Sequence, residues 1–81
     1  MKLSTVLRTF GWVQNKFGND YIGYCLLGGV SKVVNITKKA YPLDRLAQAL
    51  GIKSYDSLPS YNDAPERTLE EILVKLDRYQ L

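Results

Sequence analysis

The chain has 81 residues, 46% of them apolar and 23% charged, and eleven basic against eight acidic side chains give a net charge of +3. This length and composition predict one folded domain over residues 1–81 with a single hydrophobic core, and they exclude a disordered chain. The chain has no histidine and one cysteine. Imidazole-based catalytic triads, a structural zinc site within one chain and an internal disulfide are therefore excluded.

The single cysteine also bears on where the protein resides. A secreted protein of this size normally carries several cysteines. No stretch here resembles a signal peptide or approaches the roughly 18 apolar residues of a membrane span. We therefore expect a cytoplasmic protein with no membrane segment. Cys25 is expected to be a buried structural thiol rather than a nucleophile, because no histidine is present to activate it.

The first expected element is a helix over residues 3–10, where apolar side chains recur at the spacing of one buried helical face. Gly11 follows at once. We expect it to end this helix in the left-handed conformation, which glycine adopts without steric cost.

A turn is expected next, at the run Gly18-Asn19-Asp20 within residues 12–23. Trp12-Val13 and Tyr21-Ile22 either pair across this turn as a short β-hairpin or form an ordered loop. Both alternatives stay open, because an isolated two-stranded ribbon is marginally stable and would have to pack against helices.

Residues 24–34 are nearly all apolar and predict a second helix, central to the domain and with almost no exposed face. Gly28-Gly29 is unfavourable within a helix by about 1 kcal/mol per glycine relative to alanine. Its presence suggests that another backbone packs closely against this helix. A phosphate-binding loop is the alternative, but the glycines lack the frame of a nucleotide-binding motif.

A third helix is predicted over residues 42–50, with Pro42 in its first turn and Gly51 after its last residue. The longest irregular stretch follows, over residues 52–65. Because fourteen residues without regular structure are unusual in a compact domain, this stretch either holds a short turn or serves a function.

The last helix, over residues 69–79, is expected to begin with a capping box in which Thr68 and Glu71 satisfy each other's backbone amides. Glu71 and Lys75 are expected to pair on its outer face. The fold class is therefore mainly α: a small bundle of three or four short helices, with one short β-hairpin near residues 12–23 if that segment pairs.

Two runs of the chain form a pattern when taken together. Residues 24–29 read Tyr-Cys-Leu-Leu-Gly-Gly, and residues 61–72 lead from Tyr-Asn-Asp to Arg-Thr-Leu-Glu-Glu-Ile. In order and spacing they resemble the "CLLGA" and "WND…RT-x-EE-[VI]" segments of a family of small bacterial and phage domains of unknown function. The chain differs where Tyr61 replaces the usual tryptophan, where Gly29 replaces alanine, and in a shorter preceding loop.

The resemblance implies a small helical domain and brings no established activity, substrate or cofactor. It favours a phage-encoded or mobile-element accessory role, in which the protein acts on a host complex. We expect no enzymatic activity and no cofactor. An enzyme would have to rely on carboxylates such as Asp56 or Asp63, and this hypothesis ranks last.

The favoured hypothesis is a protein-interaction module that binds a protein partner through residues 52–63 and the neighbouring surface. Tyrosine is enriched at interfaces and polar side chains lie beside it here. The candidate contact residues are Tyr55, Tyr61, Asn62 and Asp63. For Asn62 and Asp63 two competing interpretations are that they cap the turn before the last helix, or that they form a polar site beside Arg67. Capping is favoured.

The alternative function is weak nucleic-acid binding through a patch of lysines near the end of the second helix. The candidate residues are Lys32, Lys38 and Lys39, with Lys16 and Lys53 as neighbours. A solvated surface is the simpler interpretation, because dedicated DNA-binding domains are generally far more basic.

Overall fold

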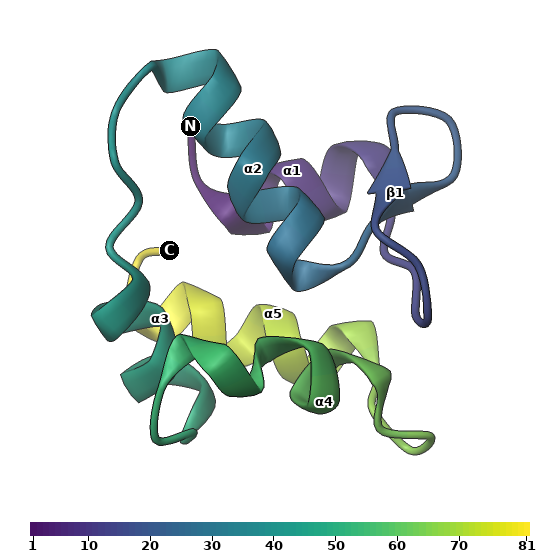
Figure 1. Cartoon of the computed structure of the whole chain (residues 1–81), viewed down its shortest axis with the longest axis vertical. Coiled ribbons are helices and arrows are strands. Elements are labelled where there is room, and N and C mark those ends of the chain that lie inside the picture. Colours follow the sequence, from purple (N-terminus) through teal and green to yellow (C-terminus); the bar gives the residue numbers. More distant parts are fainter.

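The computed structural model describes all 81 residues, as five α-helices, one 3-10 turn and one two-stranded antiparallel hairpin. The elements form two layers (Figure 1). One layer contains the hairpin with α1 (Leu3–Phe10) and α2 (Leu26–Thr37). The other contains α3 (Leu43–Leu50), α4 (Leu58–Asp63) and α5 (Leu69–Arg78). The predicted mainly helical fold with one short hairpin is confirmed.

The core lies between the layers and draws on every helix. Leu3 and Leu7 of α1, Leu26 of α2, Leu46 of α3 and Leu76 of α5 are all fully buried. Burying a leucine side chain stabilises a fold by about 1.5 to 3 kcal/mol relative to exposing it. Helices of six to twelve residues are marginal alone, so this shared burial holds them in place.

α1 spans the residues predicted for it, but its end differs from the expected left-handed cap. Gly11 adopts φ 97° and ψ 175°, a region that only glycine visits readily, while its amide still donates to the Leu7 carbonyl at 3.0 Å. The extended ψ directs the chain into Trp12, which forms a parallel bridge with Tyr24.

The hairpin forms, but from other residues than expected. β1 (Gly18–Asn19) pairs with β2 (Gly23–Tyr24), so the expected pairing of Trp12-Val13 with Tyr21-Ile22 is wrong. Tyr21 and Ile22 lie in the turn instead. The Asn19 side-chain oxygen accepts hydrogen bonds from both of their amides, at 2.8 and 3.0 Å, and this local bonding fixes the turn.

α2 begins at Leu26, two residues later than expected, because Cys25 adopts an extended conformation and caps it. The Cys25 sulfur accepts from the Gly28 amide at 3.3 Å. Within residues 24–34 only Leu27 is exposed, at 42%, so the expected burial of this segment is largely confirmed. The helix continues further than expected, to Thr37, and Ile36 in this added turn is 45% exposed.

The two glycines of α2 lie where neighbours approach closely, as expected. A Cβ atom on Gly28 would lie 2.2 Å from the backbone oxygen of Phe17, and one on Gly29 would lie 2.5 Å from a methyl carbon of Leu3. Real Cβ atoms do not approach this closely. The backbone approach is therefore confirmed at Gly28, whereas Gly29 accommodates a side chain of α1.

The third helix runs over Leu43–Leu50, with Pro42 just before its first residue and Gly51 in the left-handed conformation after its last. The stretch expected to be irregular is largely helical: a 3-10 turn over Tyr55–Ser57 leads into α4. The proline in the first turn of α4 costs no hydrogen bond there.

α5 begins with the predicted capping box: the Glu71 amide donates to the Thr68 hydroxyl at 3.2 Å, and the Thr68 amide donates to the Glu71 carboxylate at 2.9 Å. The expected pair of Glu71 with Lys75 is wrong. Glu71 pairs with Arg67 at 3.3 Å, and Lys75 donates to the Tyr61 hydroxyl at 3.0 Å. No helix of the protein has the length and apolar character that crossing a bilayer requires.

Candidate interaction surface

The structure separates the four residues predicted to contact a partner. Tyr55 lies in the 3-10 turn and is 48% exposed. Tyr61 and Asn62 are buried, at 8% and 1% exposure, and Asp63 is half-buried. The formation of α4 explains this difference, because positions 58, 61 and 62 face the core at helical spacing.

The buried Asn62 side chain joins the two layers through four hydrogen bonds. Its side-chain oxygen accepts from the Trp12 indole at 2.7 Å and from the Leu26 amide at 3.0 Å. Its side-chain nitrogen donates to the Val13 carbonyl at 3.1 Å and to the Asp63 carboxylate at 2.9 Å. The Leu26 amide belongs to the first turn of α2 and has no partner within that helix. Asn62 therefore satisfies a helix end from across the core.

The expectation that Asn62 and Asp63 cap the turn before α5 is wrong, because Thr68 caps that helix. The Asp63 carboxylate accepts from the Asn15 amide at 2.8 Å. This amide and the Asn62 side chain hold the pKa of Asp63 below its usual value. Arg67 stacks on the Tyr61 ring, with 3.7 Å between the guanidinium carbon and the ring centre.

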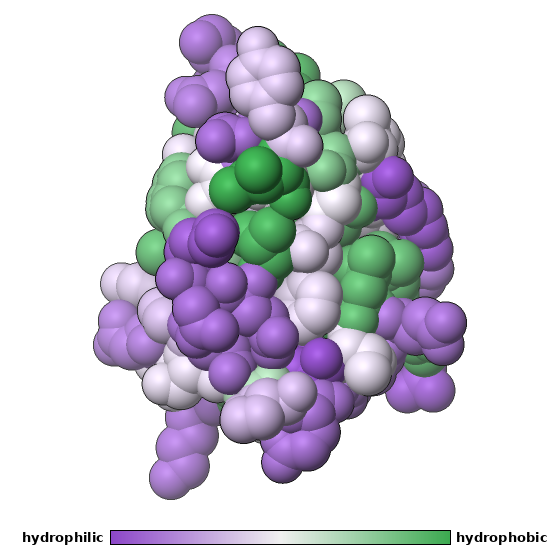
Figure 2. Space-filling model, turned by 90° about the vertical axis from the view of Figure 1, so that its right-hand side faces the viewer, coloured by the Kyte–Doolittle hydropathy of each residue, from purple (hydrophilic) through white to green (hydrophobic).

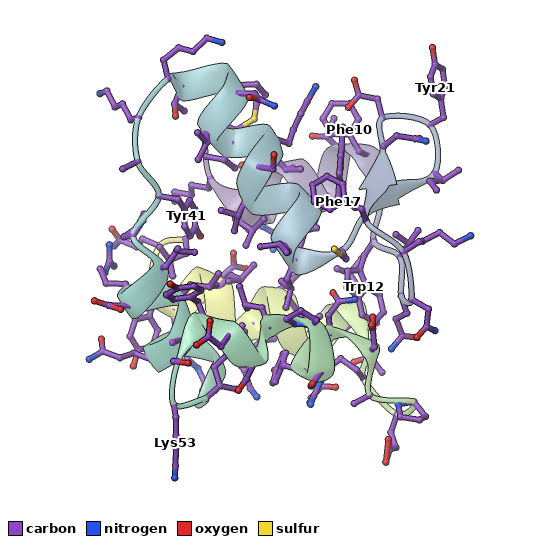
Figure 3. All side chains as sticks on the ribbon, viewed as in Figure 1. Phe10, Trp12, Phe17, Tyr21, Tyr41 and Lys53 are labelled. Carbon is purple, nitrogen blue, oxygen red and sulfur yellow. The ribbon has the colours of Figure 1, made fainter.

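The tip of the hairpin presents an exposed tyrosine on a well-fixed turn. Tyr21 is 95% exposed and Ile22 is 48% exposed, and the Tyr21 side chain points away from the molecule (Figure 3). Next to them, the Asp20 carboxylate accepts hydrogen bonds from the Tyr24 hydroxyl and, at 3.1 Å, from the Lys32 ammonium.

These hydrogen bonds shift the pKa values of Asp20 and Tyr24 at the base of the turn. The hydrogen bond from Tyr24, followed by that from Lys32, lowers the pKa of Asp20, and the same hydrogen bond to Asp20 raises the pKa of Tyr24 to about 12. The turn is thus held on both sides, by Asn19 within it and by Asp20 against α2.

A small pocket lies beside the hairpin. Its volume is about 190 Å³, and Phe17 and Leu27, which are 53% and 42% exposed, border it together with Cys25 and Pro59. Cys25 is half-buried rather than buried as expected. From the hairpin side, apolar surface appears as separate areas among polar side chains (Figure 2). This pocket could not be predicted from the sequence, because its walls come from three separate segments of the chain, at residues 16–17, 25–27 and 59–63.

The lysines do not form one patch. Lys32 pairs with Asp20 at 3.1 Å and lies 5.2 Å from the centre of the Phe10 ring. Lys38 and Lys39 are exposed beyond the other end of α2, about 9 Å further along at the rise of a helix. Lys53 points away from the far side of the molecule (Figure 3). Of the three lysines predicted to contact nucleic acid, only Lys38 and Lys39 therefore lie next to each other.

No group of three or more histidine, cysteine or carboxylate side chains is placed to hold a metal ion. Together the fold and this surface define a small, two-layered helical domain with exposed apolar side chains around a hairpin. The chain belongs to a family of unknown function, DUF6197, whose model matches residues 2–79. Comparison with curated proteins and with solved structures finds no match.

Proposed function

We propose that this domain is a protein-binding module and that its contact surface is centred on the hairpin. We define the hairpin surface as Phe17, Tyr21, Ile22, Leu27 and Pro59. The observation that carries the proposal is the 95% exposure of Tyr21 on a turn fixed by hydrogen bonds.

An exposed tyrosine on a rigid turn can contribute strongly to binding. Tyrosine is among the residues that dominate binding energy at interfaces, where one such residue contributes about 2 kcal/mol or more. Ordering a flexible loop on binding usually costs part of that gain. Here Asn19 and Asp20 already hold the turn, so most of the gain is retained.

The neighbouring pocket supports the same function. Its volume of about 190 Å³ is below the roughly 300 to 1,000 Å³ of pockets that bind small molecules. It can accept one apolar side chain of a partner, between Phe17 and Leu27, while Lys16 and Asp63 offer polar contacts at its edge. Tyr55, by contrast, does not line the pocket and belongs to the 3-10 turn, which contacts α3, so it is not part of this surface.

The resemblance to small bacterial and phage domains suggests that the partner is a host complex in the cytoplasm. Weak nucleic-acid binding through the lysines has less support, because Lys32 is already paired with Asp20. The proposal therefore rests on apolar and aromatic contact, not on charge.

The test is affinity capture from the native cell, with captured proteins identified by mass spectrometry. We expect the natural sequence to recover a reproducible partner, and Tyr21→Ala to weaken its binding by about tenfold or more. Since Tyr21 is 95% exposed, this change removes no internal contact. Tyr55→Ala is the matched control, because Tyr55 is also exposed but lies outside the hairpin surface.

The proposal fails if no partner is recovered above an empty-matrix background. It fails also if Tyr21→Ala and Phe17→Ser capture as much partner as Tyr55→Ala does.

A further inference from the structure

An open cleft of about 520 Å³ lies away from the hairpin, where the end of α2, the linker to α3 and both ends of the chain meet. Its apolar lining includes Val33, Ala40, Pro42 and the ring of Tyr41. This volume lies within the range of small-molecule sites, and it is the largest cleft of the protein.

Every charged side chain that lines the cleft is basic. These side chains are Lys2, Lys39 and Arg45. None of them belongs to an ion pair, since the three pairs of the protein are Arg8–Asp77, Lys32–Asp20 and Arg67–Glu71. Lys2 does lie close enough to Asp77 for its charge to contribute to the lowered pKa of that carboxyl. Lys39 and Arg45 are therefore the cations least engaged elsewhere.

Arg45 is also held in position. One of its terminal nitrogens donates to the Tyr79 carbonyl at 2.5 Å, so the guanidinium is fixed while its other N–H groups stay available. A guanidinium fixed in this way is suited to bind the oxygens of a phosphate, which it matches with paired hydrogen bonds.

Tyr41 gives the cleft a second group that can bind a ligand. Its hydroxyl is the one buried side-chain oxygen or nitrogen of the protein that has no hydrogen-bond partner. An unsatisfied buried hydroxyl destabilises a fold, because it loses its hydrogen bonds to water and gains none in return. The ring lines the cleft, so a ligand oxygen can reach the hydroxyl when the lining side chains shift.

We propose that this cleft binds a small ligand carrying a phosphate group, with Lys39 and Arg45 facing the phosphate and Tyr41 donating to one of its oxygens. Lys39 and Arg45 together carry two positive charges, no acidic side chain lines the cleft, and a phosphate monoester carries about −1.5 to −2 at neutral pH. The apolar lining leaves room for the organic part of such a ligand. This site is separate from the hairpin surface, so either proposal can fail alone.

The experiment follows backbone amide shifts by NMR while inorganic phosphate, and then adenosine monophosphate, is added at constant ionic strength. We expect saturable shifts confined to residues 37–45 and the chain ends. Lys39→Gln, Arg45→Gln and Tyr41→Phe should each weaken binding by about two- to fivefold, the range for exposed charge pairs and single hydrogen bonds. Lys53→Gln is the matched control, because this lysine is exposed and points away from the cleft.

Three results would overturn the proposal. Shifts that never saturate, or that Lys53→Gln reduces as much as Lys39→Gln does, would indicate unspecific screening. If Lys39→Gln and Arg45→Gln weakened phosphate binding but Tyr41→Phe did not, the result would indicate a general effect of charge and not a specific binding site. Tighter binding of a short single-stranded oligonucleotide, with shifts extending to Lys38 and Lys32, would assign the lysines to nucleic acid instead.

Discussion

Asn62 is the residue on which the two layers depend most directly. It is 1% exposed and uses both its side-chain oxygen and its side-chain nitrogen twice. Replacing it with alanine would leave the buried Leu26 amide without a partner and would remove the partner of the half-buried Trp12 indole and Val13 carbonyl. We expect Asn62→Ala to lower the free energy of unfolding by about 2 to 4 kcal/mol.

Urea unfolding followed by circular dichroism measures this loss. Ser60→Ala is the control, because Ser60 is exposed on the same helix and its loss should stay within about 0.5 kcal/mol. Equal effects of the two substitutions would contradict the role given to Asn62.

The sequence could not reveal this role. Asn62 stands beside Asp63 just before a helix, a position where both residues usually bond to the local backbone. Three of its four side-chain partners lie 36 to 50 residues earlier in the chain. Such pairing becomes visible only once the layers are assembled. The exposure of Tyr55, in contrast, agrees with its place in a polar stretch.

At the scale of elements, α2 shows how local preference yields to packing. Alanine is favoured over glycine in a helix by about 1 kcal/mol, yet a Cβ on Gly28 would meet the Phe17 backbone oxygen at 2.2 Å. That oxygen also accepts from the Cys25 amide at 3.1 Å. We expect Gly28→Ala to destabilise the protein by about 2 kcal/mol or more, as overpacking does.

Gly29→Ala is the matched comparison for thermal unfolding. Its nearest neighbour is the end of the Leu3 side chain, which can turn aside, so the loss should be clearly smaller. If Gly29→Ala proved the more damaging of the two, the backbone contact of Phe17 would not be what excludes a side chain at residue 28.

The sequence predicts the helices whose apolar residues recur over two or more turns. α1, α3 and α5 show such stripes and begin or end at glycine or a capping box, so their extents are close to expectation. α4 was missed because it has six residues and contains a proline. Its signal is the spacing of Leu58, Tyr61 and Asn62, too short to separate from chance. The hairpin register was missed because the Asn19 side chain, not strand propensity, sets it.

At the scale of the whole molecule, charge pairing predicts how stability depends on pH. The pKa values of Asp20, Asp63, Glu71 and Asp77 lie below the ordinary 3.8 of aspartate or 4.5 of glutamate. The main causes are hydrogen bonds from Tyr24, from the amides of residues 15 and 68, and from Arg8. A carboxyl whose pKa is lower in the folded state binds fewer protons there than in the unfolded state.

Stability from these groups is therefore complete above their ordinary pKa values and is lost as the pH falls through the folded-state values. We expect the urea midpoint to stay level from about pH 8 to 5, since the chain has no histidine, and to fall below about pH 4. Asp77→Asn should lower the midpoint at pH 7 and reduce this acid dependence.

Asp44→Asn is the control for that experiment, because Asp44 takes part in no ion pair. A midpoint that rises on acidification, or an Asp77→Asn variant with an unchanged acid dependence, would contradict the assignment.

The bond between Trp12 and Asn62 gives the protein an optical reporter of its own. The chain has one tryptophan, and its indole N–H is tied to the opposite layer at 2.7 Å. Its fluorescence therefore reports on the contact between the two layers, whereas far-ultraviolet circular dichroism reports on the helices. Coincident denaturation curves from the two signals would mean that the layers part only when the helices melt, and an earlier fluorescence change would reveal an opened form that keeps its helices.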